Sequence, residues 1–143
     1  MPTFDSTQYA KFAADPRQAV KINEWGGRVR AAFFSYTALG TEVATDTINL
    51  VRLPKGARVL DGHVVLDTTE ATLTMDIGTA ADPDKYGNDL DVNLLDAPAR
   101  FAHTPTLNYG VETTEDEDVI ALLNVVGLTA GTVVTGHMLY ALD

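Results

Sequence analysis

The chain has 143 residues, of which 45% are hydrophobic and 21% are charged, a composition typical of one globular domain rather than of a disordered chain. It contains no cysteine, which excludes disulfide bonds and thiolate metal sites. Its formal net charge is −10 and no apolar run is long enough to span a membrane, so we expect neither nucleic acid nor a membrane as a partner.

The first 27 residues differ from the rest of the chain. They show no alternation of apolar and polar residues, and they end in Trp25-Gly26-Gly27, where paired glycines allow a turn or a flexible joint. We therefore expect residues 1–27 to form an extended N-terminal arm and residues 28–143 to form the body. Within the arm, residues 9–15 favour one or two helical turns.

The arm is too rich in large apolar side chains for a solvated tail, since such groups are usually buried against another surface. That surface is either the body of the same subunit or a neighbouring subunit of a larger assembly, and the residues alone leave both open. The side chains concerned are Phe4, Tyr9, Phe12, Ile22 and Trp25.

The body shows the pattern of an all-β protein. Short runs rich in β-branched and aromatic residues alternate with Gly, Pro, Asp and Asn clusters, at a spacing typical of an antiparallel β-sandwich or jelly roll. The apolar runs 119–126 and 133–140 predict central strands buried on both faces. The predicted strands are 28–37, 47–53, 57–67, 71–79, 90–94, 99–102, 107–113, 119–126 and 132–142.

Alternation is clearest in residues 57–79. The inward positions are predicted to be Leu60, Val64 and Leu66 in the first run, and Leu73, Met75 and Ile77, which alternate with polar residues, in the second. We therefore expect two strands that bracket a turn and form a half-buried antiparallel ribbon.

Charge is distributed unevenly. The chain through Arg58 has eight Lys or Arg and five Asp or Glu, a balance of +3, whereas the remainder has two basic and fifteen acidic residues, a balance of −13. If the strands that carry them are neighbours, a basic rim lies beside the arm. Its members are Arg28, Arg30, Arg52, Lys55 and Arg58.

Two acidic segments follow. Residues 82–91 begin like a calcium loop, with Asp-x-Asp and Gly87 in the sixth place, but Tyr86 and Asn93 stand where further ligands belong. We interpret this segment as a solvated acidic loop, with a cation site as the alternative. Residues 115–118 predict an exposed charged turn that discourages edge-to-edge aggregation.

The sequence shows no constellation for catalysis. His63, His103 and His137 lack metal-ligand spacing, and Ser6 and Ser35 lie in no nucleophile elbow. The glycines form no phosphate-binding loop. We therefore expect a protein that is not an enzyme, with no catalytic residue, no metal and no cofactor.

Two runs resemble a known family. Leu-Pro-Lys-Gly-Ala-Arg-Val-Leu-Asp at 53–61 and the segment 71–86 are similar to a pattern in small decoration, or cement, proteins of tailed-bacteriophage heads. The resemblance covers roughly residues 47–95 and, more weakly, the closing strands, but it does not cover the arm. It implies a β-sandwich or jelly-roll subunit, commonly a homotrimer, that sits on the outer capsid and bridges neighbouring copies of the major capsid protein. It also implies a protein located in the virion and without catalytic residues. Because the first residues show neither the basic start nor the apolar stretch of a signal peptide, we expect synthesis in the host cytoplasm.

Combining residues and resemblance, we expect the arm and the basic rim to carry attachment to the capsid and to other subunits. The alternatives are a sugar- or receptor-binding β-sandwich module and a head-completion or tail structural protein. The predicted attachment residues are Phe4, Tyr9, Phe12, Ile22, Trp25, Arg28, Arg30, Arg52, Lys55 and Arg58.

Overall fold

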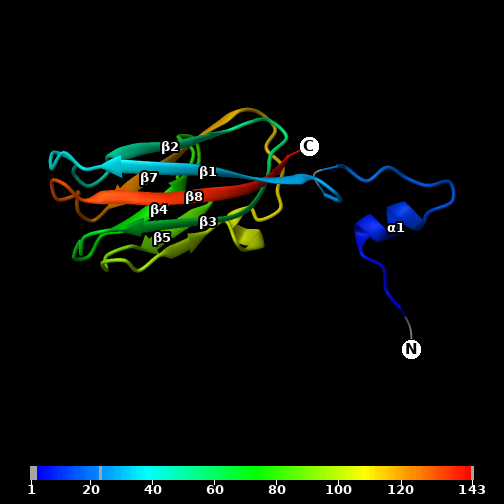
Figure 1. Ribbon diagram of the computed structural model, residues 1–143, viewed down its shortest axis with the longest axis horizontal. Coiled ribbons are helices and arrows are strands. Elements are labelled where there is room, and N and C mark those ends of the chain that lie inside the picture. Colours follow the sequence, from blue (N-terminus) through cyan, green and yellow to red (C-terminus); the bar gives the residue numbers. More distant parts are fainter. Residues whose placement is uncertain (1–2, 23, 143) are drawn as a thin grey trace.

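The computed structural model describes residues 3–22 and 24–142, which form two four-stranded antiparallel sheets packed face to face (Figure 1). Sheet A has the strand order β1-β8-β3-β6, and sheet B has the order β2-β7-β4-β5. The prediction of an all-β antiparallel sandwich is confirmed. The elements are α1 (Thr7–Ala13), β1 (Arg28–Thr37), β2 (Thr47–Leu53), β3 (Arg58–Leu66), β4 (Thr74–Gly78), β5 (Gly87–Asp91), β6 (Ala99–Phe101), the 3₁₀ helix η1 (Pro105–Leu107), β7 (Glu117–Asn124) and β8 (Val133–Leu142).

Strand existence follows the sequence closely, with two corrections. The predicted strand at 107–113 is wrong, because η1 ends at Leu107 and a left-handed turn follows it, with Asn108 at φ 58° and Gly110 at φ 74°. Only an isolated bridge between Arg58 and Glu112 remains of it. The strand predicted at 90–94 is shifted, because β5 begins at Gly87 and ends at Asp91.

The predicted ribbon of residues 57–79 is also wrong. β3 pairs with β8 and β6, whereas β4 pairs with β5 and β7, so the two strands lie in opposite sheets. The alternation itself holds in β4, where Met75 and Ile77 are fully buried. In β3, a bulge between Val59 and Asp61 places Val59 in the core rather than Leu60. Alternation reports which face is buried, but not which strand is the neighbour.

The two central strands differ in burial. In β7 the consecutive residues Val119, Ile120 and Ala121 are all buried, so this strand is covered on both faces as predicted. In β8 the outward side chains, His137 and Leu139 among them, are only half-buried, so burial on both faces is wrong for this strand. The inward-facing side chains of β8 lie in the core between the two sheets.

The arm projects from the end of the sandwich where β1 begins, and α1 stands away from both sheets (Figure 1). Ser6 caps α1, since its Oγ accepts a hydrogen bond from the Tyr9 N–H at 3.2 Å. Gly26 adopts φ 96° where the arm joins β1, a conformation that glycine allows without strain. No helix in the described part of the chain is long and apolar enough to cross a membrane.

Candidate functional site

The five large apolar side chains of the arm are exposed, by between 39% for Phe12 and 87% for Phe4. None of the arm residues described in α1 is buried. The sandwich of the same chain therefore does not shelter these side chains. The sequence left two possible surfaces open, the body of the same subunit and a neighbouring subunit. In this structure the arm's large apolar side chains are not buried against the body of their own subunit.

Three aromatic rings of the arm nevertheless contact each other. The Phe12 ring centroid lies 6.1 Å from that of Tyr9 and 5.1 Å from that of Trp25, and the Arg17 guanidinium stands 4.2 Å from the Phe12 centroid. Beside them is an open hollow of about 480 Å³, lined by Phe12, Arg17, Gln18, Ala19, Val20 and Trp25. The arm thus presents a small formed apolar surface rather than a random chain.

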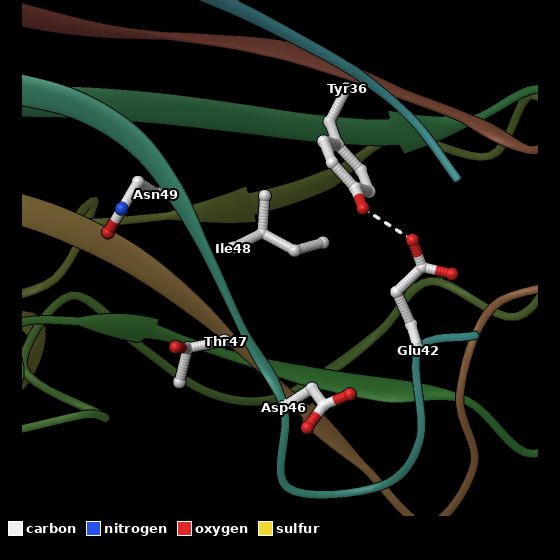
Figure 2. Close-up of a pocket in the computed structure, with 6 residues that line it drawn as sticks. All are labelled: Tyr36, Glu42, Asp46, Thr47, Ile48 and Asn49. Atoms are coloured by element: carbon white, nitrogen blue, oxygen red, sulfur yellow. Dashed lines mark hydrogen bonds between the residues drawn. The ribbon is translucent and has the colours of Figure 1, made fainter. Parts of the chain in front are cut away.

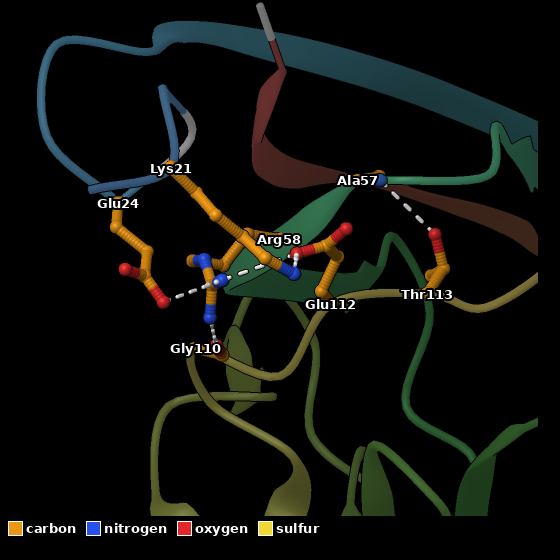
Figure 3. A network of polar contacts seen from close by, with 7 residues as sticks. All are labelled: Lys21, Glu24, Ala57, Arg58, Gly110, Glu112 and Thr113. Atoms are coloured by element: carbon orange, nitrogen blue, oxygen red, sulfur yellow. Dashed lines mark hydrogen bonds and ion pairs between the residues drawn. The ribbon is translucent and has the colours of Figure 1, made fainter. Parts of the chain in front are cut away.

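An ion-pair network ties the base of the arm to the body (Figure 3). Lys21 Nζ lies 2.8 Å from Glu112, and Arg58 pairs with Glu24 at 3.1 Å and with Glu112 at 3.3 Å. Arg58 also donates to the carbonyl of Gly110, and its side chain is largely buried. Arg58 therefore holds the arm in place from within the body.

The remaining members of the predicted basic rim differ in availability. Arg28 is the backbone register partner of Leu142 in the ladder between β1 and β8. It therefore lies at the end of the sandwich from which the arm projects. Arg52 is paired with Asp118 at 3.3 Å and approaches Asp116 at 4.0 Å. Among residues 3–22 and 24–142, the exposed side chains of Arg28, Arg30 and Lys55 have no ion-pair partner. The uncompensated positive charge of the rim therefore lies on these three residues.

The acidic segments are partly structural. In residues 115–118, Glu117 accepts hydrogen bonds from Lys85 Nζ at 2.5 Å and from the Tyr86 hydroxyl at 2.7 Å. Burial, together with this carboxylate, raises the pKa of Tyr86. Asp116 accepts from the backbone N–H of Lys55 at 2.8 Å. In the chain as described, no three His, Asp or Glu side chains gather in a way that could hold a metal ion.

Two of the three histidines meet on the outer face of sheet A. His63 of β3 and His137 of β8 are cross-strand partners with ring centroids 5.2 Å apart, and the exposed Phe33 of β1 lies 5.7 Å from His137. His103 follows β6 and lies outside this pair. Sequence reasoning missed the pairing because it depends on strand register, which no local pattern reports.

A hollow of about 510 Å³ lies at the β1–β2 corner and is lined by Tyr36, Glu42, Asp46, Thr47, Ile48 and Asn49 (Figure 2). Glu42 accepts hydrogen bonds from the Tyr36 hydroxyl and from the backbone N–H groups of Leu39 at 2.9 Å and Gly40 at 2.8 Å. These donors satisfy the carboxylate, so we assign it to the folding of the loop rather than to a ligand site.

The hydrogen bond from Tyr36 and those from the backbone lower the pKa of Glu42 from 4.5 to about 2. The ionised carboxylate therefore stabilises the fold above pH 4.5, and this contribution is lost as the pH falls from 4.5 towards 2. We expect Glu42→Gln to be less stable than the parent at pH 7 and the gap to narrow on acidification. Urea titrations between pH 7 and pH 3 measure it, with exposed Glu115→Gln as the control; a constant gap would contradict the assignment.

Comparisons with known proteins show where this fold also occurs. Neither a protein-family model nor a curated protein matches the sequence. Among solved structures, a chain of the cyanophage Pam1 capsid asymmetric unit is similar over 100% of both chains, with 26% identity and a TM-score of 0.68.

Two further capsid structures contain a similar fold. A chain of the Ralstonia phage GP4 capsid matches 82% of this chain and 86% of its own length, with 19% identity and a TM-score of 0.66. A chain of the acidic stable capsid structure of Helicobacter pylori bacteriophage KHP30 matches 80% and 87%, with 17% identity and a TM-score of 0.56. The fold of this chain, arm included in the first case, is therefore one found in phage capsid structures.

Proposed function

We propose that this chain is a virion structural protein of a tailed bacteriophage, which binds the outer capsid surface and cements neighbouring major capsid subunits against internal pressure. The observation that carries the proposal is the likeness to a chain of the cyanophage Pam1 capsid asymmetric unit over the full length of both chains. In this role the protein acts through contact area and not through catalysis, and it needs no cofactor.

The strand order is compatible with this role. Successive strands alternate between the sheets except β4 and β5, which pair within sheet B, and we interpret the order β1-β8-β3-β6 facing β2-β7-β4-β5 as a jelly roll. Jelly rolls occur in viral capsids and also in lectins, so the fold alone does not decide the function. The likeness to capsid chains favours the virion role over sugar recognition.

The arm is the proposed attachment element. Each of its large apolar side chains, once buried against a partner, contributes about 2 kcal/mol. In a homotrimer three such arms act together, and linked contacts gain avidity beyond that of any single one. Arg28, Arg30 and Lys55 add positive charge next to the arm, whereas the exposed carboxylates of segments 82–91 and 115–118, all but that of Glu117, face solvent or a neighbouring copy.

Deletion of residues 1–27 tests the proposal. The truncated body keeps both sheets and should remain folded, but it should no longer occupy capsids that lack the native protein. Particle-bound protein is measured after purified subunits are added to such capsids, and cryo-EM density shows the symmetry axis that the full-length protein occupies. The solution mass of the full-length protein tests the homotrimer.

Two matched variants separate attachment from folding. Phe4→Ser with Ile22→Ser removes exposed apolar groups and should weaken occupancy, whereas Asp5→Ser changes an exposed polar residue of the same arm, outside the hollow, and should not. Circular dichroism checks that the parent protein, the double variant and the single variant are all folded. Full occupancy by the truncated body, or glycan binding by a protein that ignores capsids, would contradict the proposal.

A further inference from the structure

The four sheet edges are protected to different degrees. β6 is three residues long, β5 is five residues long and carries Asp89 and Asp91, and β2 is interrupted by a bulge between Asn49 and Val51. Short length, charge and bulges are the means by which natural sheets discourage a further strand from pairing. β1 has ten residues, pairs with β8 without a register shift, and contains neither proline nor lysine. Its edge is therefore the best template for an additional strand.

The hydrogen-bonding direction along β1 follows from its partner. The Ala38 N–H donates to the carbonyl of Thr132 at 2.8 Å, just beyond the strand, so Ala38 points its backbone groups towards the β8 side. Because this direction alternates along an antiparallel strand, even-numbered residues of β1 face β8. The N–H and C=O groups of Val29, Ala31 and Phe33 then face the open edge.

The side chains of the same segment divide by charge. Phe33 is 77% exposed and Val29 is 62% exposed, and both project from the face that carries Ala31. Arg28 and Arg30 project from the opposite face, where both are exposed and, within the described ranges, free of ion pairs. One face of residues 28–33 thus offers apolar contacts, and the other offers two guanidinium groups.

We propose that the open edge of β1 over residues 28–33 accepts an extended segment of another polypeptide in which acidic and apolar residues alternate. Main-chain hydrogen bonds to Val29, Ala31 and Phe33 hold this added strand. Its carboxylates lie beside Arg28 and Arg30, and its apolar side chains lie beside Val29 and Phe33, because same-face neighbours contact across a strand pair. The inference concerns the strand edge itself, so its test requires no viral shell.

The probe is a fluorescent ten-residue peptide of alternating Glu and Val. The control is a peptide of the same composition in blocked order, in which the Glu residues and the Val residues form two separate blocks. Fluorescence anisotropy of the full-length protein should show at least about tenfold tighter binding of the alternating peptide. Hydrogen exchange followed by NMR should show new protection of the amides of Val29, Ala31 and Phe33, with those of Ala32 and Phe34 unchanged.

Variants test the two halves of the recognition separately. Ala31→Pro removes an outward N–H without touching the β8 ladder, as edge positions allow, and should reduce binding at least about tenfold. Arg28→Glu with Arg30→Glu keeps every backbone group, and should lose the Glu-Val peptide and gain a Lys-Val peptide. Arg100→Gln removes a charge from β6, the strand at the opposite edge of sheet A, and should change neither.

Several results would overturn the inference. If the blocked-order peptide binds as tightly as the alternating peptide, the binding is general electrostatic attraction and not strand addition. If neither peptide binds, the edge of β1 is not a binding site for such a segment. Protection of the same amides without peptide, dependent on protein concentration, would make a second copy of this chain the occupant. If Ala31→Pro unfolds the protein, the charge-reversed pair decides the outcome alone.

Discussion

Replacing Glu70 with alanine should lower the free energy of unfolding by about 3 kcal/mol, because a buried acceptor of several hydrogen bonds would be lost. Glu70 is only 7% exposed and lies in the segment that carries the chain from β3 in one sheet to β4 in the other. Its carboxylate accepts from Thr129 N–H at 2.8 Å, from Thr129 Oγ1 at 3.1 Å and from Thr132 Oγ1 at 2.7 Å. It therefore joins this crossing segment to the loop between β7 and β8.

The cost of the change arises mainly from what it leaves behind. Thr132 is 1% exposed, so its hydroxyl would be buried without this acceptor. Glu70→Gln keeps the shape and one carbonyl oxygen, and should lose clearly less stability than Glu70→Ala. Urea unfolding measures all three proteins, with exposed Glu115→Ala as the control. A loss for Glu70→Ala no larger than that of the control would show that water replaces the carboxylate.

Glu70 also shows what a single sequence does not reveal. It stands between Thr68-Thr69 and Ala71 in a polar stretch that predicts an ordinary solvated turn. Its burial depends on residues about sixty positions away, which reach it only because β3 and β4 lie in opposite sheets. The predicted ribbon and the predicted solvated turn fail for the same reason, because alternation does not identify the partner of a strand and so does not reveal the crossing between sheets that buries Glu70.

The candidate attachment surface was predictable in a similar, uneven way. The arm could be recognised because residues 1–27 lack alternation while holding large apolar groups, and composition reports such a mismatch without any knowledge of the fold. The sequence could not show which residues of the basic rim lack an ion-pair partner. Arg58 and Arg52 look like Arg28 in the sequence, but acidic residues distant in the chain meet the first two and not the third.

The edge of sheet A offers a prediction with an effect of similar size. Gly62 of β3 pairs with Phe101 of β6, and a Cβ at Gly62 would lie 2.2 Å from Phe101 Cε2 and 2.4 Å from Cζ. The fully buried ring thus covers the glycine. Gly62→Ala should lower the free energy of unfolding by about 2–3 kcal/mol, because the ring must leave its position in a packed core.

A double-mutant cycle shows whether this ring is the cause. Phe101→Leu alone leaves a cavity and should cost about 1–2 kcal/mol, but it also makes room for the added methyl group. The double variant should therefore be more stable than the two single losses predict, by at least about 1 kcal/mol. Ile48→Val serves as the control partner, since it lies in β2 at the opposite edge of the sandwich and should combine additively with Gly62→Ala. Strict additivity with Phe101→Leu as well would mean that the cost at position 62 arises from the strand backbone, and that the ring adapts freely.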